Sequence, residues 1–213
     1  MTMIVAVQEE RGPRKPKHNQ LCPQQLPGAF SRIPTDKLRL IYTQTNHFES
    51  NSTYELAAQI FLTAIKQARR NSGFGHLRRH SQNIILGHLW APLFILKAAH
   101  WPSDTASFFP FLQKVIKHIK LLELDGSTME FFENILLCRV ELLEDPEEVN
   151  QANAILEKSL EALNLLTASN RTKFTNILLS STLLFTPSAV ALHSLLFKPI
   201  IGIVPIETVI ATI

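Results

Sequence analysis

The chain has 213 residues, 46% of them hydrophobic and 18% charged, which suits one compact domain with a sizeable core. Its formal net charge of +3 excludes a bulk polycation that would attract nucleic acid by charge alone. Two cysteines, Cys22 and Cys138, exclude a disulfide framework. Met1–Val7 is too short for the apolar core of a secretory leader, so we expect a reducing compartment.

The first 50 residues show no clear hydrophobic periodicity. Residues 1–19 are polar and contain the cations Arg11, Arg14 and Lys15, while residues 20–50 contain three prolines. These residues are interpreted as a polar N-terminal segment followed by a partly disordered hinge.

From Ser52 the apolar residues recur at steps of three and four, which predicts an amphipathic helix. Its apolar stripe comprises Leu56, Ala57, Ile60, Phe61, Ala64, Ile65 and Ala68. A second helix is predicted from about Ser81 to His100. Its apolar residues cover most of its circumference, so we expect it to be central and buried, with a kink at Pro92.

Five further helical segments are predicted in the second half. Phe109–Leu122 is amphipathic, and Ser127 with Glu130 resembles a capping box that opens a helix over Met129–Leu143. Asp145-Pro146 combines an N-cap residue with proline at the first helical position, a strong start for the next helix. Arg171–Phe185 and Pro187–Lys198 follow, and a short apolar tail, Ile206–Ile213, closes the chain.

No convincing strand is predicted, so we expect an all-α domain layered around the Ser81–His100 helix. Phe174–Phe197 contains no Asp, Glu, Lys or Arg and has the length of a membrane span, but Pro187 divides it. We interpret it as a buried pair of core helices and expect no membrane partner.

Catalytic and metal-binding patterns find little support. The eight histidines include no HExxH motif and no paired metal-ligand spacing, so we expect neither an enzyme nor a metal site.

One segment carries a more specific signal. It places Ala68-Arg69, Phe74, Leu77, Gln82, Ile85-Leu86 and Trp90 at fixed spacings. This pattern resembles the helix 3 to helix 5 signature of nuclear-receptor ligand-binding domains. Ala6–Arg14 and Leu196–Gly202 with Pro205–Thr208 are similar to runs in the tailless and photoreceptor-specific group of that family.

The resemblance implies a three-layer helical sandwich over residues 51–213, a nuclear location and a role in transcription regulation. It identifies residues 1–19 as a remnant of the DNA-binding-domain extension, where Arg11, Arg14 and Lys15 would make weak backbone contacts with DNA. Two zinc fingers need eight cysteine ligands, and this chain has two. Zinc and specific DNA binding are therefore expected only in a longer form with fingers upstream, and no cofactor in this chain.

The resemblance also implies a coregulator groove, in which a docked helix is held at its two ends. Arg69 stands at the basic clamp position, Gln82 at a bracing position, and Ile85 on the groove. Thr212 stands where the family carries an acidic clamp residue. Losing one charged hydrogen bond would weaken a coactivator helix roughly 10- to 100-fold. Longer corepressor helices do not use that acid, so the resemblance favours repression.

Two further surfaces are implied by position. A ligand pocket would be lined by Ala57, Ile60, Phe61, Trp90, Ala91, Phe94 and Ile95, and its bulky side chains favour a filled, unliganded core. A dimer stripe would comprise Leu192, Leu195, Leu196 and Phe197. We therefore predict a repressor acting through corepressor proteins and homo- or heterodimer contacts with nuclear receptors. The alternatives are a sensor of a small lipophilic ligand and an interaction-only, dominant-negative partner of a full-length receptor.

Overall fold

The computed structural model describes residues 47–213, except for the side chains of residues 47–50 and of residue 171. The N-terminal segment, nearly all of the hinge and the DNA contacts expected at Arg11, Arg14 and Lys15 lie outside these residues. The described part of the chain is all-α and contains no strand, which confirms the predicted class.

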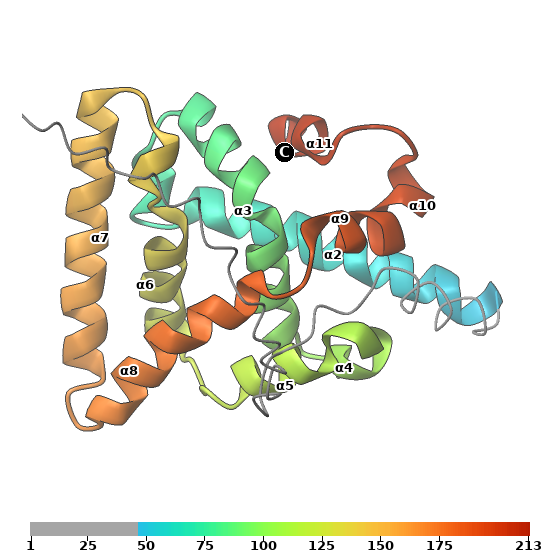
Figure 1. Cartoon of the computed structure of the whole chain (residues 1–213), viewed down its shortest axis with the longest axis horizontal. Helices are drawn as coiled ribbons and strands as arrows, with labels where there is room; N and C mark the ends of the chain where they lie inside the picture. Colours follow the sequence, from blue (N-terminus) through green and yellow to red (C-terminus); the bar gives the residue numbers. More distant parts are fainter. Residues whose placement is uncertain (1–46) are drawn as a thin grey trace, which may run out of the picture. The chain divides into compact units, whose positions relative to one another are not determined.

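Figure 1 shows the helices in chain order. The first half contains α2 (His47–Arg70), the 3-10 turn η1 (Phe74–His76), α3 (Arg79–Ala99), α4 (Thr105–Phe108), η2 (Pro110–Leu112), α5 (Gln113–Lys120) and α6 (Gly126–Leu137). The second half contains η3 (Val140–Leu142), α7 (Pro146–Leu166), α8 (Arg171–Ser180), η4 (Ser181–Phe185), α9 (Ala189–Leu192), the π-helical turn η5 (His193–Phe197), α10 (Lys198–Ile201) and α11 (Ile206–Thr212).

The central helix is α3, as predicted. It packs against α2, α5, α6, η4 and α11, and its side chains from Leu89 to Leu96 are all buried. Pro92 lies inside this helix and is buried with its neighbours. A helix that is apolar on every side is stable only when other elements surround it, and α3 has such neighbours on several faces.

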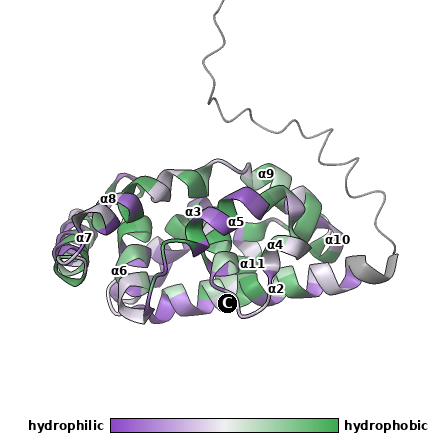
Figure 2. Cartoon of the chain, turned by 90° about the horizontal axis from the view of Figure 1, so that it is seen from below, coloured by the Kyte–Doolittle hydropathy of each residue, from purple (hydrophilic) through white to green (hydrophobic). Residues whose placement is uncertain are grey.

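The apolar stripe of α2 is also confirmed. Six of its seven residues are buried, and Leu56 is partly buried against the same core. Figure 2 shows hydrophobic and hydrophilic stretches alternating along α2, as a stripe on one face of a helix requires. The periodicity therefore located both the helix and the face that it buries.

The helix caps were predicted with mixed success. Asp145 accepts a hydrogen bond from the backbone N–H of Glu147 (3.0 Å) and Pro146 opens α7, as expected. The capping box at Ser127 is wrong, because the N-cap of α6 is Asp125, which accepts from the backbone N–H of Thr128 (2.8 Å). This helix also ends at Leu137 instead of Leu143.

The predicted break at Pro187 separates η4 from α9. The helix predicted over Pro187–Lys198 consists of α9, the π turn η5 and the start of α10. No single described helix has the length and apolarity to span a membrane, although the pair Thr172–Phe185 and Ala189–Ile201, bent by 62°, passes the same criteria together. Several side chains of this pair are buried in the core: Ile177, Leu184, Leu192, Leu196 and Phe197.

Candidate functional site

Arg69, in the last turn of α2, joins three parts of the chain. Its Nη1 donates to Gln82 Oε1 at 3.0 Å, and its Nη2 donates to Asn83 Oδ1 at 2.7 Å, both on α3. The same Nη2 donates to the backbone carbonyl oxygen of Ile210, on α11, at 2.8 Å. One guanidinium group thus ties the last helix of the chain to the ends of α2 and α3.

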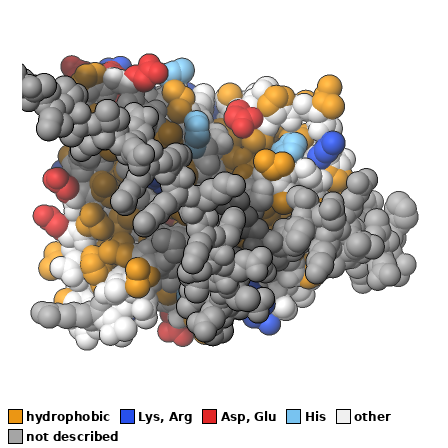
Figure 3. Space-filling model, in the orientation of Figure 1, with side chains coloured by type: hydrophobic (Ala, Val, Ile, Leu, Met, Phe, Trp, Pro, Cys, Tyr) orange, Lys and Arg blue, Asp and Glu red, His pale blue; other side chains and the backbone are white. Residues whose placement is uncertain are grey.

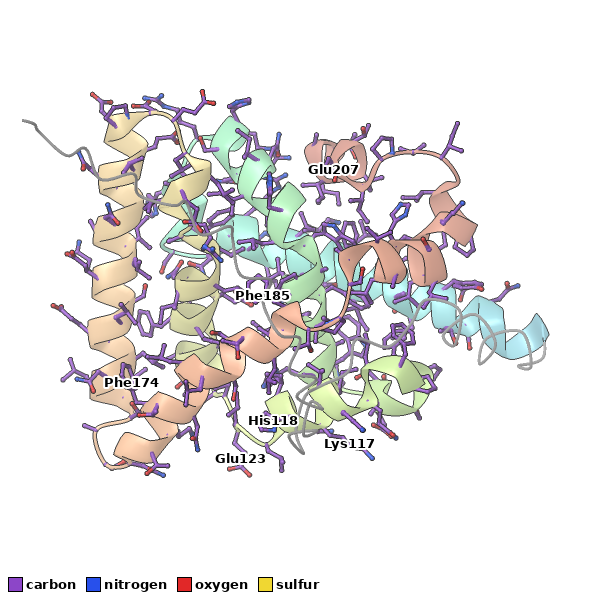
Figure 4. All side chains as sticks on the ribbon, viewed as in Figure 1. Lys117, His118, Glu123, Phe174, Phe185 and Glu207 are labelled. Atoms are coloured by element: carbon purple, nitrogen blue, oxygen red, sulfur yellow. The ribbon has the colours of Figure 1, made fainter. Side chains whose placement is uncertain are left out.

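The helix α11 lies on α3 with its apolar face inward. Ile206 and Ile210, one helical turn apart, are buried, and Val209 is partly buried. At the N-terminal end of α11, the Cγ of Glu207 lies 3.3 Å from the point that a Cβ would occupy on Gly87 of α3. Figure 4 shows Glu207 on this helix. The absence of a side chain at Gly87 therefore allows α11 to approach α3 closely.

The charge of Arg69 suits the end of α11 that it binds. Ile210 lies in the last turn of α11, at the negative end of the helix dipole, and its carbonyl oxygen also accepts from the backbone N–H of Ile213 at 3.2 Å. Burial, helped by repulsion from Arg79, lowers the pKa of Arg69 to about 10, so the side chain stays protonated at neutral pH. Its buried Nε has no hydrogen-bond partner among the described residues.

The other expected groove residues have different environments. Gln82 braces the turn before α3, since its Nε2 donates to the carbonyl oxygens of Gly75 (3.1 Å) and Leu77 (2.8 Å). Ile85 is fully buried and belongs to the core. Thr212 is exposed, and its hydroxyl donates to the carbonyl oxygen of Val209 in its own helix at 2.7 Å.

The seven expected pocket residues are all buried, and aromatic rings fill the space among them. Phe197 contacts three of these rings, with centroid distances of 5.1 Å to Phe61, 5.4 Å to Trp90 and 5.6 Å to Phe94. Such edge and tilted contacts are favourable ring geometries. The ring of Phe197 thus packs among three of the side chains that were expected to line a pocket.

The expected dimer stripe needs correction. Leu192, Leu196 and Phe197 are buried within the chain, and Leu195 is partly buried. Side chains packed in the core cannot also form a surface for a partner. The large hydrophobic side chains that are exposed in this part of the chain are Leu179, Phe185, Val190, Ile200, Ile203 and Val204.

Three side chains of this site were missed by the sequence analysis. Asn83 accepts from Arg69, and no spacing pointed to this contact. Ile206 and Ile210 anchor α11, and their four-residue separation with Val209 between them is the signal that would have identified an amphipathic helix.

Neither the protein-family models nor the curated proteins contain a match to this chain.

The described residues also contain no group of three or more His, Cys, Asp or Glu side chains placed to hold a metal ion. Cys138 is buried, and burial raises the pKa of its thiol to about 12. A thiol with so high a pKa is a weak nucleophile at neutral pH.

Proposed function

We propose that this chain is a nuclear-receptor-like transcription regulator that acts in the nucleus as a repressor, with the family's three-layer helical sandwich. The observation that carries the proposal is the seat of α11, which is held against α3 by two buried isoleucines and one arginine. The corepressor is the partner expected at this site, and homo- or heterodimer contacts are expected elsewhere.

The contacts of α11 are those that a guest helix would need. An amphipathic guest inserts apolar side chains one turn apart and presents its carbonyl end to a cation. Ile206 and Ile210 take the first role, and the Ile210 carbonyl oxygen, bound to Arg69, takes the second. A guest helix at this site must therefore displace α11.

Displacement of α11 leaves a site with one charged clamp. Arg69 can then bind the guest's carbonyl end, whereas Thr212, which is uncharged and leaves with α11, holds nothing at the opposite end. A charged hydrogen bond contributes about 1.5–3 kcal/mol, so a short helix that relies on two clamps is penalised. A longer helix compensates with additional apolar contact, and this favours corepressor over coactivator peptides.

The ligand-sensing alternative has less support. Phe197 packs against Phe61, Trp90 and Phe94, so a ligand among these side chains would have to separate aromatic rings that are already in contact. Close-packed interiors accept extra volume at a cost of about 1–3 kcal/mol.

The test is fluorescence-polarisation binding of the full chain to one corepressor and one coactivator helix peptide. We expect the corepressor peptide to bind more tightly. Ile210→Asp places a charge at a buried position of α11 and should release this helix from α3. Peptide binding should then strengthen at least tenfold. Arg69→Ala should weaken it at least tenfold, because the remaining clamp is lost.

Arg70→Ala is the matched control, because Arg70 is the exposed neighbour of Arg69. Thermal melting of each variant distinguishes loss of the groove from loss of the fold. If neither peptide binds the native chain or the Ile210→Asp chain, the proposed function is wrong.

A further inference from the structure

A second groove lies away from α11, between α5 and the segment formed by α8 and η4. Its volume is about 360 Å³. We refer to it as the α5–α8 groove. It is lined by His118, Leu121, Leu122, Asn176, Leu179, Ser180, Thr182 and Leu183.

Four leucines line the α5–α8 groove, and two of them are largely exposed. Leu121 is 78% exposed and Leu179 is 64% exposed, and Phe185 follows at the end of η4. Figure 3 shows hydrophobic side chains gathered over the part of this face where α7 and α8 lie. Single exposed leucines are ordinary, but several that border one groove mark an interaction surface.

The wall formed by α5 is cationic. The inner face of this helix buries Ile116 and Ile119, whereas Lys114, Lys117 and His118 are exposed. Lys114, His118 and Leu121 share one outward face at steps of four and three, and Lys117 precedes Leu121 by one turn. Figure 4 shows Lys117 and His118 side by side on α5.

The wall formed by α8 adds one more cation. The Nζ of Lys173 donates to the backbone carbonyl oxygen of Glu123 at 3.2 Å, which places the ammonium group beside the end of α5. The two walls also touch directly, since His118 Nε2 and Ser180 Oγ are 3.4 Å apart.

Acidic residues are rare in both walls. The sequence contains no Asp or Glu from Thr105 to Leu122, and none from Ala162 to Ile206. Glu123 and Asp125 follow α5 immediately, and they are the carboxylates that flank the groove in the sequence. The surface therefore combines exposed leucines with a positive rim.

We propose that the α5–α8 groove docks an acidic amphipathic helix of a partner protein. Leucine-type side chains of that helix would lie on Leu121, Leu122 and Leu179, and its carboxylates would lie beside Lys114, Lys117 and Lys173. This binding goes beyond the repressor function proposed for the α11 site and does not depend on it.

Charge and apolarity together select this occupant. Nucleic acid would match the lysines but not the exposed leucines, because phosphate contacts need cations and not an apolar floor. A second copy of the chain joined symmetrically through α5 would bring lysines against lysines, which repel. An acidic helix with an apolar face satisfies both properties of the groove.

The test is a fluorescence-polarisation titration of the full chain with a labelled designed helix that carries leucines at steps of three and four and glutamates between them. We expect binding that weakens with salt but persists at high salt, because the leucine contacts are not screened. Lys114→Glu with Lys117→Glu should weaken binding at least tenfold, and so should Leu179→Ser.

The matched control is Lys120→Glu with Lys158→Glu, which makes the same change in charge away from the groove. Lys120 lies on α5, on the side where its charge lowers the pKa of His100, and Lys158 lies on α7. The control should leave binding unchanged, and so should Arg69→Ala, which separates this groove from the α11 site.

Several results would overturn the proposal. Equal binding of a scrambled peptide of the same composition, or of a labelled DNA duplex, would show that the groove binds anions in general and does not select an amphipathic helix. Loss of a dimer in light scattering on Lys114→Glu with Lys117→Glu, without any change in peptide binding, would assign the surface to a second copy. If Lys120→Glu with Lys158→Glu weakens peptide binding equally, the groove is excluded as the binding site.

Discussion

Glu133, on α6, is a carboxyl group that the fold removes from water. It is buried, and this burial raises the pKa of Glu133 above its ordinary value of 4.5. Lys97 and a hydrogen bond to Asn71 oppose the rise, and Glu130 adds to it. Because the folded pKa is higher than the unfolded one, the folded state binds the proton more tightly.

We therefore expect Glu133→Gln to stabilise the protein at neutral pH. The stability that protonated Glu133 contributes is present below pH 4.5 and is lost as the pH rises through its raised pKa. The glutamine amide stays uncharged at every pH, so its burial carries no cost of removing a charge from water. Urea unfolding at several pH values measures the difference. The advantage of the variant should shrink as the pH falls toward 4.5, and an advantage that is independent of pH would contradict this account.

Gly73, in the turn between α2 and η1, offers a test of close packing. A Cβ there would lie 2.6 Å from both Asn134 Oδ1 and Ile155 Cγ2. Asn134 cannot move freely, because its Oδ1 accepts from the backbone N–H of Phe74 at 3.0 Å. We expect Gly73→Ala to destabilise the protein by about 1–3 kcal/mol in urea unfolding.

Gly126 is the matched control for this substitution, since a Cβ there meets no atom within 4 Å. Gly126→Ala should change stability by less than about 1 kcal/mol and in the favourable direction, as alanine suits a helix better than glycine. Equal effects of the two substitutions would show that packing at Gly73 is not the cause.

Individual residues were predictable from the sequence where local pattern decides their role. Asp145 was expected as an N-cap because it precedes Pro146, and its carboxylate accepts from the backbone N–H of Glu147. The role of Asn134 was not predictable, because it depends on a turn 60 residues away in the sequence. Such contacts arise only when α6 packs beside η1.

At the scale of elements, the hydrophobic periodicity predicted where helices lie better than where they begin. The apolar stripe of α2 and the apolar run of α3 each extend over many residues, so no single residue changes the prediction of a helix there. The start of α6 was less certain, because both Asp125 and Ser127 are good capping residues and lie two positions apart. The structure selects Asp125, whose carboxylate accepts from Thr128.

We expect Asp125→Ala to lower stability by about 1 kcal/mol and Ser127→Ala to have a much smaller effect. Two hydrogen bonds from Thr128 hold the pKa of Asp125 below its ordinary 3.8. The bond from the backbone N–H has the larger effect and the bond from the hydroxyl group the smaller. The stabilising effect is therefore present above pH 3.8 and is lost as the pH falls through the lowered pKa. Urea unfolding near neutral pH and again in acid, where the two chains should converge, measures both parts.

At the scale of the whole molecule, the position of α11 was the least predictable feature. The tail was predicted only as a short apolar segment, and its position depends on a hydrogen bond between residues 141 positions apart. The space that admits it depends on a glycine in the middle of α3. Burial of Leu192 and Leu196, two residues of the expected dimer stripe, likewise depends on long-range packing, since α9 packs on η5 and η5 packs on α2.

The helix α11 should open independently of the core. It has seven residues, two buried anchors and an exposed connection at Ile203 and Val204, so few contacts hold it. Hydrogen exchange followed by mass spectrometry should show peptides of α11 exchanging faster than those of α3. Arg69→Ala removes a charged hydrogen bond of about 1.5–3 kcal/mol, so exchange in α11 should accelerate roughly 10- to 100-fold while α3 changes little. Arg70→Ala, the neighbouring exposed arginine, should leave both rates unchanged. If α11 and α3 instead accelerate together in the Arg69→Ala chain, the last helix unfolds only with the whole domain and cannot yield its seat to a guest.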